Sequence, residues 1–141
     1  MPLGTTFAND IAKLILNATA VANLADNAAT SPATILYIGL HTSDPSAGNQ
    51  TTSEAGYTGY ARVATDRGGS GWTVTSNVAA PFSAITFPEG TAGGETCTYA
   101  SVGTASSGTG KILMSGALSV SIATGAGKIP QIKTTSTITF T

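Results

Sequence analysis

The residues best suited to chemistry in this chain are His41 and Asp44, which are three positions apart. An imidazole beside a carboxylate can transfer protons, and both groups are common metal ligands. A protein metal site needs three or four ligands, however, and His41 is the only histidine in the sequence. Asp44 also precedes Pro45, a combination typical of a turn. We therefore interpret the pair as turn residues at a strand end and predict no metal site.

The single cysteine, Cys97, lies in a strand-like segment and has no partner for a disulfide within the chain. A reactive thiol needs a nearby base, and His41 is far away in the sequence. We predict that Cys97 is a small packing residue. The glycine-rich segments match neither a phosphate-binding loop nor a dinucleotide fingerprint. The sequence therefore predicts no catalytic residues and no cofactor.

Charge is scarce, since only 9% of the 141 residues are charged and the net charge is −1. A typical globular domain carries about 25% charged residues. Few charges leave little repulsion between copies, which suits a protein that packs against neighbours. No basic footprint for nucleic acid is evident. No apolar run reaches the roughly 18–20 residues of a membrane span, so we expect no membrane insertion.

Residues 6–25 carry the one clear helical pattern. Its apolar residues recur every three or four positions, as one face of a helix requires. They are Phe7, Ile11, Leu14, Ala18, Val21 and Ala25. This helix either covers a sheet or docks onto another subunit, and the sequence leaves both interpretations open.

Beyond residue 33 the apolar period changes from 3.6 to 2, which predicts strands. The expected strands span residues 34–41, 58–66, 71–76, 82–87, 96–104, 110–115, 117–123 and 135–141. Short strands at such spacing indicate a sandwich or barrel. We predict a mainly β fold in which an N-terminal helical segment, residues 1–30, precedes a jelly-roll or Greek-key-like antiparallel β-sandwich, residues 31–141.

Aromatic side chains make up 6% of the residues. Tyr57, Tyr60, Trp72 and Tyr99 could form a sugar-stacking platform, but a core or a subunit interface is the better interpretation of so few rings. The candidate interface residues are Phe7, Ile11 and Leu14 on the helix, with Tyr57 and Tyr60.

The segment LYIGLHTSDPSAGNQTTSEAGYTGYARV, residues 36–63, resembles a family of small virion structural proteins of tailed bacteriophages, usually labelled phage tail fibre proteins. The resemblance continues through Gly71–Thr75, Ile85–Pro88, Ser101–Ala105 and Gly110–Leu113, and covers residues 33–133. It implies a structural protein of the virion, made in the host cytoplasm, with no catalytic residues to carry over.

Two places in the virion fit this resemblance. The chain has no repeats and no shaft, which favours a capsid decoration protein, that is, a minor capsid or cement protein. Such a protein would bind the major capsid protein as an oligomer, most simply a homotrimer, and repeated contacts would stabilise the lattice. The alternative is a tail fibre or tail-associated protein that contributes to host-surface attachment, with a host glycan as partner.

Overall fold

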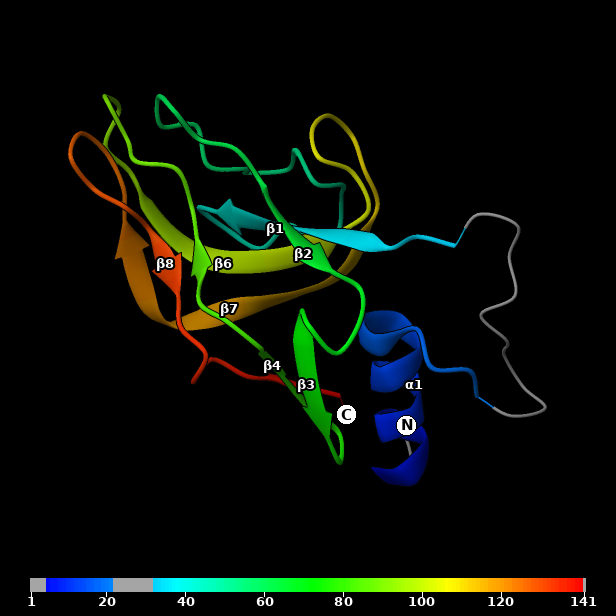
Figure 1. Cartoon of the computed structure of the whole chain (residues 1–141). Helices are drawn as coiled ribbons and strands as arrows, with labels where there is room; N and C mark the ends of the chain where they lie inside the picture. Colours follow the sequence, from blue (N-terminus) through cyan, green and yellow to red (C-terminus); the bar gives the residue numbers. More distant parts are fainter. Residues whose placement is uncertain (1–4, 22–31, 141) are drawn as a thin grey trace. The chain divides into compact units, whose positions relative to one another are not determined.

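A computed structural model of the protein describes residues 5–21 and 32–140 (Figure 1). The chain forms two compact units that are interleaved in sequence. The helix unit contains residues 1–35, 66–84 and 133–141, and the network unit contains residues 36–65 and 85–132. The predicted boundary at residue 30 lies outside the described residues.

The helix unit combines α1 (Thr5–Asn17) with an antiparallel sheet. The order of strands in the sheet is β3-β4-β9. Their bounds are Trp72–Thr75 for β3, Val78–Pro81 for β4 and Ile138–Thr139 for β9. Because α1 contacts β3 and β4, it covers a face of this sheet, as one of the two interpretations expected. Trp72 is buried, as predicted for a core residue.

The helix differs from its prediction in length and in its buried face. It ends at Asn17, because Ala18 adopts a positive φ of 52° and leaves the helical region. The most buried side chains are Ala8, Ala12 and Leu16, spaced four apart. Leu16 lies outside the predicted apolar stripe, so the helix is rotated relative to that prediction.

Arg67 binds the C-terminal end of α1. Its guanidinium donates to Leu14 O at 2.6 Å and to Ile15 O at 2.7 Å, and a third bond reaches Ala33 O at 3.1 Å. The last carbonyls of a helix have no intrahelical partner and carry the negative end of the helix dipole. The Arg67 cation therefore satisfies these carbonyls and joins α1 to the chain that follows β2.

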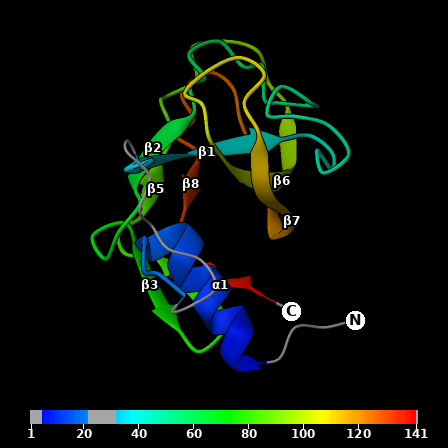
Figure 2. The same cartoon turned by 90° about the vertical axis from the view of Figure 1, so that its right-hand side faces the viewer.

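The network unit contains a sheet with the order β2-β1-β6-β7 (Figure 2). Its strands are β1 (Ile35–His41), β2 (Val63–Asp66), β6 (Thr96–Gly103) and β7 (Ile112–Ala123). A two-stranded ladder pairs β5 (Ile85–Thr86) with β8 (Gln131–Ile132). The buried apolar side chains include Leu36, Ile38, Leu40, Ile85, Phe87, Val102 and Ile132.

The predicted class is confirmed, since the described chain is mainly β with one short N-terminal helix and antiparallel, sandwich-like sheets. Nine strands are present in the part of the chain that the structure describes. The jelly-roll order remains a prediction. Two predicted strands, 110–115 and 117–123, form the single strand β7, because Gly116 stays paired with Ala100. Two strands, β4 and β8, had no prediction.

Candidate functional site

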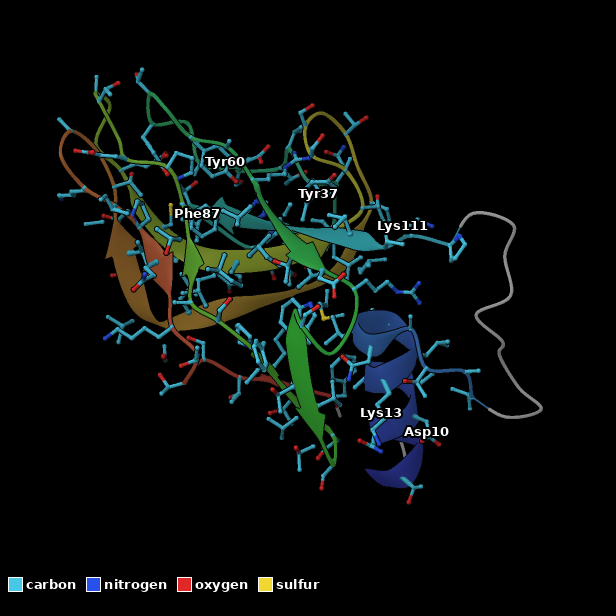
Figure 3. All side chains as sticks on the ribbon, viewed as in Figure 1. Asp10, Lys13, Tyr37, Tyr60, Phe87 and Lys111 are labelled. Atoms are coloured by element: carbon cyan, nitrogen blue, oxygen red, sulfur yellow. The ribbon has the colours of Figure 1, made fainter. Side chains whose placement is uncertain are left out.

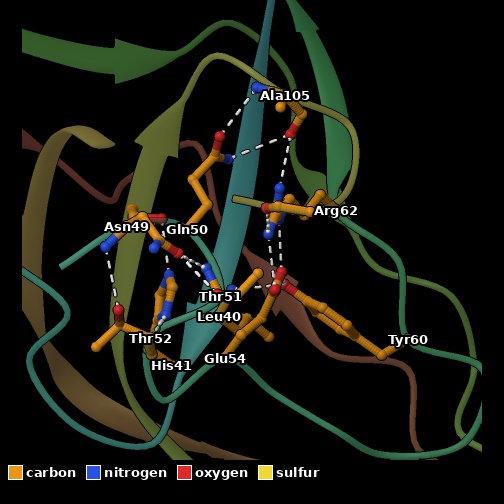
Figure 4. Close-up of polar contacts among 12 residues, drawn as sticks. Leu40, His41, Asn49, Gln50, Thr51, Thr52, Glu54, Tyr60, Arg62 and Ala105 are labelled. Atoms are coloured by element: carbon orange, nitrogen blue, oxygen red, sulfur yellow. Dashed lines mark hydrogen bonds and ion pairs between the residues drawn. The ribbon is translucent and has the colours of Figure 1, made fainter. Parts of the chain in front are cut away.

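A buried polar network lies in the network unit, where two long connections meet the end of the sheet (Figure 4). We define the polar network as His41, Gln50, Glu54, Tyr60 and Arg62. His41 ends β1, and the other four residues belong to the connection between β1 and β2. His41, Gln50 and Arg62 are buried polar or charged residues.

The centre of the polar network is an ion pair between Arg62 and Glu54. Arg62 Nε lies 2.6 Å from Glu54 Oε1, and a second guanidinium nitrogen lies 2.7 Å from Oε2. The two side chains are 2% and 17% exposed. The hydrogen bonds to Glu54 raise the pKa of Arg62, so the guanidinium is charged. A buried charge is tolerated only when it is paired and fully hydrogen-bonded, and this bidentate geometry meets that condition.

The remaining donors of Arg62 hold the connection between β6 and β7. They reach Ala105 O at 3.0 Å and Gly108 O at 2.8 Å. Gln50 binds the same connection: its side-chain amide donates to Ala105 O and accepts from Ala105 N, and its backbone N–H donates to Gly110 O. The ion pair and Gln50 thus tie both connections together.

Gln50 fits its site only because Gly103 and Gly110 have no side chains. A Cβ on Gly103 would lie 2.1 Å from Gln50 Cδ, and a Cβ on Gly110 would lie 2.0 Å from Gln50 Oε1. Real Cβ atoms essentially never approach so closely. These two glycines therefore create the space for the amide.

Tyr60 connects the ion pair to the apolar core. Its hydroxyl donates to Glu54 Oε1 at 3.0 Å and accepts from Leu40 N at 3.1 Å. Its ring lies edge-on to Tyr57 and stacks on Phe87, with centroids 5.4 and 6.3 Å away. Tyr60 and Phe87 are labelled in Figure 3. Burial raises the pKa of Tyr60 far above its ordinary value, so the phenol is neutral.

His41 lies between Thr52 and Ser101. Thr52 O is 2.9 Å from Nδ1, and a carbonyl only accepts, so Nδ1 carries the proton and donates. Nε2 then accepts from Ser101 Oγ at 2.7 Å. A serine bonded to an oriented histidine has the geometry of an activated nucleophile. Both side chains are buried, at 0% and 2% exposed, and through them Thr52 O is joined to β6 inside the fold.

The carboxylate of Glu95 binds the backbone of the connection between β1 and β2, two to three residues after Glu54. Glu95 Oε1 accepts from Gly56 N at 2.5 Å and from Tyr57 N at 3.1 Å. The hydroxyl of Tyr57 donates to Pro88 O at 2.9 Å. This part of the connection is therefore fixed to the segment between β5 and β6.

Together these contacts order a surface that we call the loop rim, residues 42–53 and 104–110. Its exposed residues are mostly threonine, serine, alanine and glycine. The loop rim has one charged residue, Asp44, whose Oδ1 accepts from Ser46 N at 2.9 Å. That contact is the turn predicted for Asp44, whereas the ring of His41 is hydrogen-bonded to Thr52 O and Ser101 Oγ.

Three of the five candidate interface residues belong to the helix unit and two belong to the network unit. Ile11 and Leu14 are half-buried on α1, and the side chain of Phe7 lies outside the described residues. Tyr57 is buried at 3% exposed, and Tyr60 is half-buried with its hydroxyl inside the polar network. The two tyrosines thus have roles within the fold, and an intersubunit role for the set remains a prediction.

The sequence prediction missed Gln50, Glu54, Arg62 and Ser101 as members of one site. Arg62 offered the only signal, because an arginine among apolar residues of a predicted strand needs a buried partner. Nothing in the spacing identified Glu54 as that partner. The buried Cys97 agrees with its predicted packing role, and burial raises the pKa of its thiol to about 11.

Among the described residues, no group of three or more histidine, cysteine, aspartate or glutamate side chains is placed to hold a metal ion. The described part of the chain also has no helix that is long and apolar enough to cross a membrane.

We predict that Arg62→Ala lowers the free energy of unfolding by about 3–5 kcal/mol, because Glu54 keeps its burial but loses its cation. Urea unfolding of the purified variant measures this change. Lys128→Ala is the matched control, since it removes an exposed cation of the same unit. A loss for Arg62→Ala no larger than that of the control would contradict the role of the pair.

We also predict a pH dependence due to His41. Burial lowers the pKa of its ring below the ordinary value of 6.5, so the unfolded chain binds a proton more readily than the folded chain. The contribution of His41 to the free energy of unfolding is therefore constant above about pH 7. It falls as the pH drops below about 6.5, by at most about 1.4 kcal/mol per pH unit. Unfolding at pH 7.5 and pH 5.5 measures the fall. In His41→Gln this component should vanish, and an unchanged slope would refute it.

In a comparison with protein families, a family model described as "Podophage GP4 fiber I protein gp80" matches residues 5–140. The match thus includes α1, the sheets of both units and the polar network. A comparison with curated proteins finds no match.

Proposed function

Because the chain belongs to the family described as "Podophage GP4 fiber I protein gp80", we propose that it is a fibre protein through which the virion attaches to its host. The family makes the protein phage-derived and virion-associated. It favours the tail-fibre alternative of the sequence analysis over a capsid decoration protein. The family match over residues 5–140 is the observation that carries this proposal.

The loop rim is the surface that we assign to attachment. Its two segments are held by Arg62 and Gln50, so little conformational entropy remains to be lost when a ligand binds. Its exposed hydroxyl and backbone groups suit a neutral, hydrogen-bonding ligand such as a host glycan. The proposed role is binding without catalysis, with other virion proteins holding the chain in the particle.

Competition for adsorption tests this function. The purified protein should reduce adsorption of the phage to host cells in proportion to its concentration. Ala47→Arg with Ser106→Arg places two bulky cations on exposed positions of the loop rim and should abolish competition. Thr135→Arg with Thr137→Arg is the control on exposed positions of the helix unit and should compete like the unchanged protein.

Two results would contradict the proposal. One is an unchanged rate of adsorption at saturating protein. The other is a copy number in the hundreds per particle, measured by quantitative mass spectrometry, which would restore the capsid decoration interpretation.

A further inference from the structure

The outer edge of β7 has the properties of a contact between copies of this chain. β7 is the end strand of its sheet, and β6 is the only strand with which it pairs in the described part of the chain. Over its 12 residues no side chain is buried, whereas β6 buries four of eight. Leu113 is 37% exposed and Val120 is 79% exposed.

Proteins usually protect such an edge with lysines, proline or a bulge, because unpaired backbone groups recruit another strand. The sequence from Ile112 to Gly127 contains no charged residue and no proline. The pairing of β7 with β6 has two irregularities: residues 118–121 stand opposite Thr98 alone, and Leu113 has no partner between Ile112 and Met114. Between these two irregularities, Met114 to Ala117 pair regularly with β6 and lack all three protections.

We propose that two copies of this chain associate by antiparallel pairing of the first half of β7 with itself, centred on Ser115. Side chains alternate between the faces of a sheet, and opposite residues must lie on the same face. A two-fold axis perpendicular to the sheet therefore lies midway between one residue and the same residue of the second copy. Centring on Ser115 sets Met114 opposite Gly116 of the second copy and Leu113 opposite Ala117. Each large side chain then lies beside a small one.

Charge favours the same arrangement. Lys111, labelled in Figure 3, is exposed at the start of β7 and is the nearest charged residue in sequence to the proposed centre. Antiparallel pairing places the Lys111 side chains of the two copies at opposite ends of the paired segment, whereas parallel pairing would bring them together. A second copy also presents the same uncharged edge, so neither partner buries a charge.

Cross-linking tests the register. Opposite residues in antiparallel strands have Cα atoms about 4.5–5.5 Å apart, within the range that a disulfide spans. Ser115→Cys should therefore form a covalent dimer under mild oxidation, seen on a non-reducing gel. Ser106→Cys, on an exposed loop position of the same unit, is the control and should form only a background amount. The native Cys97 is buried in both proteins.

Sedimentation tests the association itself. The unchanged protein should sediment with the mass of two copies, and Leu113→Lys should shift it to one copy. Ile129→Lys is the control, because Ile129 is 59% exposed and lies outside β7, and this variant should remain a dimer. Circular dichroism checks that all variants are folded.

The proposal fails if Ser115→Cys cross-links no faster than Ser106→Cys, or if Leu113→Lys retains the mass of two copies. A monomer would also overturn it, and so would the trimer expected from the sequence. None of these results depends on adsorption to a host cell, so they are separate from the test of the attachment function.

Discussion

The buried ion pair between Arg62 and Glu54 is the interaction on which the ordered end of the network unit depends. A guanidinium out of water requires an acceptor for its donors, and the carboxylate requires donors in return. Here the acceptors are Glu54, Ala105 O and Gly108 O. The hydroxyl of Tyr60 donates a further hydrogen bond to the Glu54 carboxylate. Because these partners come from two separate connections, the pair can be satisfied only when both connections adopt one conformation.

The same constraint explains how a chain with so few charges uses them. Several of its charged groups bind backbone or one another inside a unit: Arg67 binds carbonyls at the end of α1, and Glu95 binds two amides. Charges used internally leave the loop rim and the edge of β7 almost neutral. Neutral surfaces do not repel one another, which suits a virion protein that is surrounded by other copies and other proteins.

The sequence predicted what depends on local pattern and missed what depends on contacts between distant segments. The predicted ranges of β1 and β6 agree with the structure to within a residue, and β1 has apolar residues at every second position, Leu36, Ile38 and Leu40. The end of α1 was wrong because the apolar period continues past Asn17 while the backbone turns at Ala18. Tyr60 and Arg62 were expected in a strand, yet they precede β2, because their partners pull that stretch into the polar network.

Amide hydrogen exchange of the loop rim tests most directly whether the ion pair orders it. Gln50 N and Ala105 N lie in loops but are hydrogen-bonded to Gly110 O and to Gln50 Oε1. If the polar network holds the rim, both amides exchange as slowly as the amides of β6 that pair with β7, and Glu54→Gln accelerates the exchange of the two loop amides selectively. Exchange of both amides at the rate of a free loop in the unchanged protein would contradict the account.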